Sequence, residues 1–181
     1  INKLHNLRGD CMSLLFGDET KDCFSLADSN HAFRNLFNGN EGLVDASELS
    51  LKAVALGTYC YYGMFGNCTN LVNVPELPAV ALNNVCYAYM FQNCANLNEA
   101  PVLPATELVS SCYSYMFDGC TNLKTAPELP AETLAYGCYS YMFNGCTNLT
   151  KAPILPATTL AENCYKNMFS GCTNLVEAMD L

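Results

Sequence analysis

The chain has 181 residues, a formal net charge of −9 and charged residues at only 14% of its positions, while 51% are hydrophobic. This composition can bury a substantial core, but it offers no basic patch for a phosphate backbone or an anionic membrane, so we expect no nucleic-acid partner. No apolar run approaches the roughly 18 residues needed to cross a bilayer, so no membrane-spanning segment is predicted. The chain starts at Ile1 without a signal-like stretch, and we expect any export signal to lie outside this sequence.

The first part of the chain has no internal period. We predict that residues 1–30 form an N-terminal cap, because the end of a repeat array needs an atypical, more polar face. This segment contains Cys11 and Cys23, which could pair as a disulfide. Residues 31–56 read as a looser first repeat that lacks cysteine but aligns Phe37 with Phe65 of the next copy.

The rest of the chain repeats itself every 26 residues. Five copies of a cysteine-containing motif are CYYGMFGNCTNL (60–71), CYAYMFQNCANL (86–97), CYSYMFDGCTNL (112–123), CYSYMFNGCTNL (138–149) and CYKNMFSGCTNL (164–175). They alternate with the proline-containing elements NVPELPAVAL, EAPVLPATEL, TAPELPAETL and KAPILPATTL. A fixed period of this length indicates a stacked array. We therefore predict a single domain in which residues 31–181 form one degenerate repeat, four regular 26-residue repeats and a final half repeat.

The sequence of one repeat predicts a short strand followed by a helix. Residues 123–129 favour a short strand, because Pro127 has no N–H to donate and limits the pairing. Four apolar residues then recur at i, i+4, i+8 and i+12, which is typical of one face of a helix of about three turns: Leu134, Cys138, Met142 and Cys146. The Asn-Gly pair before Cys146 suits a helix end.

Stacking such repeats predicts a curved array. Parallel strands lie about 4.8 Å apart, whereas packed helices need roughly 8–10 Å. The helices should therefore fan outward, leaving the strands on a concave face and the helices on a convex face.

The combined pattern CxxxMFxxCTNLxxAPxLPATxL resembles the BspA-like leucine-rich repeats of bacterial surface proteins. The lead-in GDCMSLLFGD, residues 9–18, resembles the segment that precedes such arrays. The resemblance implies an α/β leucine-rich-repeat solenoid, a right-handed superhelix, located at the cell surface or outside the cell. The strand core reads LxxAPxL rather than the usual LxxLxL, so strand geometry is the least transferable part of the resemblance.

The spacing of the cysteine pairs does not predict a metal site, disulfide bonds or a catalytic nucleophile. Their C-x₇-C spacing differs from the C-x₂₋₄-C of structural zinc sites, and no histidine recurs beside them, so we expect no metal and no cofactor. Stacked or helix-spaced cysteines should lie too far apart for disulfides, and we predict columns of buried free thiols. A cysteine nucleophile needs a base, and the two histidines, His5 and His31, lie in or near the cap, so we expect no enzyme.

Two polar columns recur with the same period. We expect the asparagines to hydrogen-bond from repeat to repeat, and they are Asn70, Asn96, Asn122, Asn148 and Asn174. We expect the tyrosines after each first cysteine to pack in the core, with a stacking surface for a glycan as the alternative, and they are Tyr61, Tyr87, Tyr113, Tyr139 and Tyr165. Tyr89, Tyr115 and Tyr141 could form an exposed aromatic row on the outer helix.

Positions just after each strand leucine vary freely, as expected of a binding surface on the concave face. The candidate partner-binding residues are Asn73, Glu99, Lys124, Thr125, Thr150, Lys151 and Glu177. We predict a non-catalytic cell-surface or extracellular module that binds an extracellular protein or glycan in adhesion or host and matrix interaction. The alternative is a structural spacer or stalk that presents another domain, which the near identity of the later repeats favours.

Overall fold

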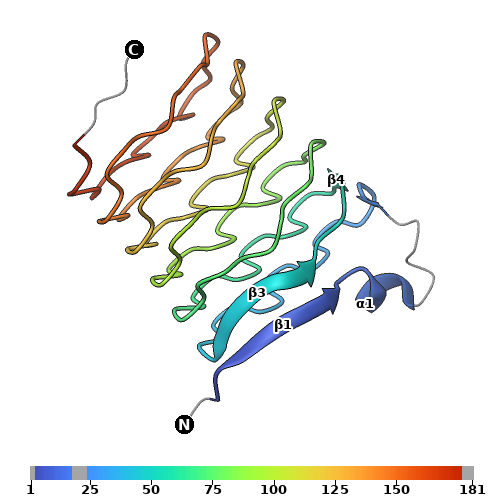
Figure 1. Cartoon of the computed structure of the whole chain (residues 1–181). Helices are drawn as coiled ribbons and strands as arrows, with labels where there is room; N and C mark the ends of the chain where they lie inside the picture. Colours follow the sequence, from blue (N-terminus) through green and yellow to red (C-terminus); the bar gives the residue numbers. More distant parts are fainter. Residues whose placement is uncertain (1–2, 18–23, 177–181) are drawn as a thin grey trace.

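The computed structural model describes residues 3–17 and 24–176. The chain winds into a stack of coils, one per repeat, with the N-terminal strands at one end and the last repeat at the other (Figure 1). Regular elements are confined to the first coils, and they are β1 (His5–Asp10), α1 (Ser13–Phe16), β2 (Ser25–Leu26), β3 (Leu43–Ser50) and β4 (Ala55–Leu56).

The strands are short and parallel, as predicted. β1 pairs with β3 and β2 pairs with β4, so the N-terminal segment lies directly beside the first coil. In later coils the pairing shrinks to single bridges, such as Glu99–Thr125 before the two prolines and Glu107–Thr133 after them. Proline has no N–H and interrupts the ladder between these two points, so each strand is even shorter than its sequence suggests.

The predicted helices are wrong, because each of these segments is a ribbon of tight turns. In one ribbon Gly137, Tyr141 and Gly145 have φ values of 59°, 57° and 72°. A left-handed residue at every fourth position cannot continue a right-handed helix. Among the described residues the only α-helix is α1. The i, i+4 spacing of apolar residues reflects the four-residue period of the turns.

Backbone hydrogen bonds in a ribbon alternate between local and inter-coil partners. The N–H of Met142 donates to the carbonyl of Tyr139 at 3.2 Å, whereas that of Phe143 donates to Met168 in the next coil at 2.9 Å. Throughout the ribbons the inter-coil donor belongs to the earlier coil and the acceptor to the later one. The main-chain groups are thereby paired without a helix.

This pairing weakens the reason for the predicted arc. The rings of Phe65, Phe91 and Phe117 stack at 5.6 and 5.7 Å, well below the roughly 8–10 Å that packed helices need. The mismatch that predicted concave and convex faces is therefore much smaller than expected. We call the side carrying the bridges the strand face (residues 72–81, 98–107, 124–133 and 150–159) and the opposite side the turn face (residues 59–67, 85–93, 111–119, 137–145 and 163–171).

The core lies between these faces as columns of identical side chains. Tyr61, Tyr87, Tyr113 and Tyr139 are at most 1% exposed. Their rings stack from coil to coil at 5.7–6.0 Å. The core prediction is confirmed for these four tyrosines, whose ring faces are covered, whereas Tyr165 at the end of the column is only partly buried.

Candidate binding surface on the strand face

The structure places six of the seven predicted binding residues on the exposed strand face. The bridges Glu99–Thr125 and Thr125–Lys151 align three of them in one column. Asn73 faces Asp45 of β3 in the same way. Glu177 lies outside the described residues.

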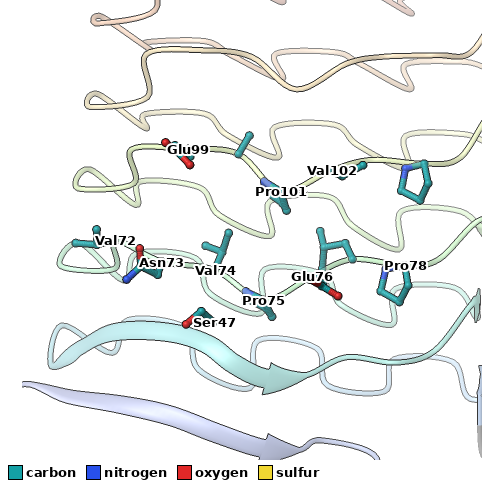
Figure 2. A pocket seen from close by; sticks show the side chains of 13 residues that line it. Ser47, Val72, Asn73, Val74, Pro75, Glu76, Pro78, Glu99, Pro101 and Val102 are labelled. Carbon is teal, nitrogen blue, oxygen red and sulfur yellow. The ribbon is translucent and has the colours of Figure 1, made fainter.

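A groove of about 540 Å³ crosses the strand face between two consecutive coils. Figure 2 shows Asn73 and Glu99 at one end of this groove and Pro78 at the other, with Pro75 and Pro101 between them. Of the seven predicted residues, only Asn73 and Glu99 line it. The candidate site is therefore narrower than the predicted surface.

Sequence reasoning missed the column between the two prolines. Glu76 and Val102 of this column line the groove, and Val102 is 77% exposed. Two coils further on, the same column contains Glu128 and Ile154, the latter 81% exposed. The signal was present, because this column varies as freely as the chosen ones.

Asp45 of β3 lies beside the groove and is hydrogen-bonded to two residues of its lining, Ser47 and Asn73. Asp45 accepts bonds from the hydroxyl and amide of Ser47 at 2.7 and 2.8 Å and from the Asn73 amide at 3.0 Å. The bonds from Ser47 and then that from Asn73 hold the pKa of the Asp45 carboxyl below its ordinary value. Asp45 is therefore a carboxylate beside the Asn73 end of the groove, where Glu99 also lies, while Glu76 lines the groove nearer Pro78 (Figure 2).

The main chain of the groove is also unusual. Among the described residues, none of 75–79 or 101–105 makes a backbone–backbone hydrogen bond. Each segment contains two prolines, which have no N–H to donate, so neighbouring coils cannot form a continuous strand ladder here. The groove thus combines an apolar lining, unpaired peptide groups and carboxylates.

A family model described as the BspA type leucine-rich repeat region matches six copies over residues 48–176. The chain belongs to this family. No curated protein and no solved structure matches it. Membership makes the chain a repeat module of the protein-interaction or surface type. Of the helices in residues 3–17 and 24–176, none is long and apolar enough to span a bilayer.

The cysteines of these BspA-type repeats pack in the core, as predicted. The second cysteine of each repeat donates its S–H to a phenylalanine carbonyl of the preceding coil, as Cys94 does to Phe65 at 3.2 Å. Burial raises the pKa of Cys68 to about 11 and that of Cys86 to about 12, which disfavours the reactive thiolate. Cys11 is buried, while Cys23 lies outside the described residues, so their pairing stays a prediction.

The asparagine column forms the predicted ladder. The side-chain amide of Asn96 donates to Asn70 at 3.3 Å, and that of Asn122 donates to Asn96 at 3.2 Å. The ladder continues through Asn148 to Asn174. Together with the thiol bonds it fixes the register of the BspA-type coils, and so positions the groove.

Proposed function

We propose that this BspA-type array is a non-catalytic module that binds an extended segment of a partner protein across its strand face. We further propose that it is a right-handed solenoid, displayed at the cell surface or outside the cell, and that it serves adhesion. Family membership supports the repeat architecture and an interaction role. The groove between Asn73 and Pro78 carries the specific proposal.

The lining of the groove indicates the partner's chemistry. Pro78, Pro104 and Val102 offer apolar contact that an aliphatic or aromatic side chain would bury. Glu76 and Glu99 would pair with lysine or arginine on either side of that side chain. The unpaired peptide groups of 75–79 and 101–105 would bond an extended main chain, as an exposed sheet edge does. These coils are held in place by the core columns, so little ordering entropy is lost on binding.

The test is a binding measurement on single-residue variants. The intact protein is screened by biolayer interferometry against matrix proteins, glycans and synthetic peptides in which one apolar residue is flanked by lysine or arginine. Glu76→Lys should weaken binding of the selected peptides by roughly tenfold or more, since a repulsive pair replaces an attractive one. Glu128→Lys is the matched control, because it occupies the same column outside the groove.

The outcomes separate the candidate functions. Equal binding by Glu76→Lys, Val102→Ser and the control would remove the groove from consideration. Binding of glycans alone, or of no ligand at all, would favour a carbohydrate-binding module or a structural stalk respectively.

A further inference from the structure

Three tyrosines on the turn face form a tight stack. The ring centroids of Tyr89 and Tyr115 lie 4.7 Å apart at an interplanar angle of 7°. Those of Tyr115 and Tyr141 lie 4.5 Å apart at 5°. The row predicted from the sequence thus exists, on a turn ribbon rather than a helix, and it is packed more closely than the buried column of Tyr87 and Tyr113, at 5.8 Å.

The backbone beneath this row is strained. Tyr89, Tyr115 and Tyr141 have φ values of 60°, 57° and 57°. Bulky side chains are rare in this left-handed region, and such outliers concentrate at functional positions. The equivalent positions in the flanking coils hold Gly63 and Asn167, residues that adopt this conformation more readily. Tyrosine is therefore kept in three successive coils against its backbone preference.

The rings are nearly parallel and occupy the same position of successive coils, on backbone with nearly the same φ. Burial raises the pKa of Tyr115, and the neighbouring Tyr141 and Asp118 raise it further. Equivalent side chains on equivalent backbone point the same way, so like carbons of neighbouring rings, including those ortho to the oxygens, lie about one ring spacing apart. Each central face is covered by the next ring, so the row exposes edges rather than a platform for a sugar.

We propose that this tyrosine row is an oxidative modification site, at which Tyr115 couples to Tyr89 or Tyr141 to form a dityrosine bond between adjacent coils. The site lies on the face opposite the groove and does not depend on the proposed function. The ring edges of the row are partly exposed, whereas the thiols of neighbouring Cys112 and Cys120 are fully buried. Those thiols are therefore poorly placed to intercept the modification.

The reaction requires a one-electron oxidant, which we assign to a haem peroxidase using hydrogen peroxide. Each phenol loses one electron and one proton and becomes a phenoxyl radical. The two radicals form a carbon–carbon bond ortho to their oxygens, and the hydrogen on each bonded carbon moves to its ring oxygen, restoring both phenols. The protein loses two hydrogen atoms in total, and the peroxide takes up two electrons and two protons to give two waters.

The experiment uses the whole protein with a haem peroxidase and hydrogen peroxide. Trypsin cuts after Lys52, Lys124 and Lys151, so a Tyr115–Tyr141 bond joins peptide 53–124 to peptide 125–151. We expect this joined peptide by mass spectrometry, lighter by two hydrogen atoms than the sum of its parts. We also expect dityrosine fluorescence from protein monomer at a yield independent of protein concentration.

Two variants distinguish the row from other tyrosines. Tyr115→Phe keeps the ring but should abolish both proposed bonds. Tyr136→Phe removes a phenol that is 51% exposed and lies in the same tryptic peptide as Tyr141, and it should leave the yield unchanged. The proposal is overturned if Tyr115→Phe forms as much intramolecular product as the parent chain, or if the product appears only between molecules.

Discussion

The thiol of Cys120 donates a hydrogen bond to the main-chain carbonyl of Phe91 in the preceding coil, at 3.1 Å. The same carbonyl accepts the local N–H of Cys94, also at 3.1 Å. One oxygen therefore closes a turn within its own coil and bonds the next coil. Cysteine at this position is therefore both a small apolar filler and a donor.

Replacing Cys120 by alanine should lower the free energy of unfolding by about 1–3 kcal/mol, because a buried bond and part of a packed side chain are lost. Urea denaturation followed by circular dichroism measures the change. Cys172→Ala is the control, since its bond to Phe143 has the same 3.1 Å length at a less buried site. Equal losses in the two variants would contradict a role for burial.

The buried thiols predict a loss of stability in alkali. Burial raises the pKa of Cys86 from 9.0 to about 12 and that of Cys138 from 9.0 to about 11. The unfolded chain therefore releases these protons first as the pH rises, so the stabilisation is complete below about pH 9 and declines above it. The urea midpoint should be constant between about pH 7 and 8 and fall steadily above about pH 9. A midpoint that does not move up to about pH 11 would show that the thiols are not buried as described.

The asparagine ladder predicts sensitivity to one added charge. Asn122 donates to Asn96 at 3.2 Å and accepts from Asn148 at 3.3 Å. Asn122→Asp keeps the acceptor but sets a carboxylate against the Asn96 oxygen, so the free energy of unfolding should fall by about 1–3 kcal/mol. Asn98→Asp, at an exposed strand-face position in the same coil as Asn96, should change it by less than about 0.5 kcal/mol. A similar effect of both substitutions would assign the loss to net charge rather than to the ladder.

The tyrosine core predicts a stabilising substitution. The buried hydroxyls of Tyr61, Tyr87 and Tyr113 have no hydrogen-bond partner among the described residues. Because an unsatisfied buried hydroxyl costs about 1–3 kcal/mol, Tyr113→Phe should raise the free energy of unfolding by up to that amount. Thermal and urea denaturation measure it, with Tyr136→Phe at an exposed position as the control. A clear destabilisation by Tyr113→Phe would show that the hydroxyl has a bonding role.

The sequence predicted the columns because equivalent residues of an exact repeat must stack. Cys94, Asn96 and Tyr87 could each be assigned to a ladder or to the core from recurrence alone, and the structure agrees. The helix prediction failed because a spacing of four suits both a helix and a ribbon with a four-residue turn. The signal that separates them was Gly137 and Gly145 at both ends of one segment, since each adopts a left-handed conformation there.

The candidate site was predicted only in part. Asn73 and Glu99 were found because the column that they share varies between repeats. Pro75 and Pro101 were not among the predicted binding residues, because those were chosen from columns that vary, although a recurring proline can equally well line a groove. The strained Tyr115 could not be recognised, because its residue type argues against the conformation that it adopts.

The one-way direction of the turn-face hydrogen bonds determines how this protein can change length. The main-chain N–H of Phe91 donates to the carbonyl of Met116, and that of Phe117 donates to the carbonyl of Met142. Every coil therefore presents the same acceptors to the coil before it and the same donors to the coil after it. Duplicating or deleting a whole 26-residue unit therefore joins matching surfaces and leaves every turn-face amide at the new junction with a partner. Inter-coil and local donors alternate along a ribbon, so inserting or deleting one residue would shift this alternation by one position. Amides that bond the next coil would then face their own turn, and the reverse, along the rest of that ribbon. Recombination between repeats can thus lengthen or shorten the array only in complete units.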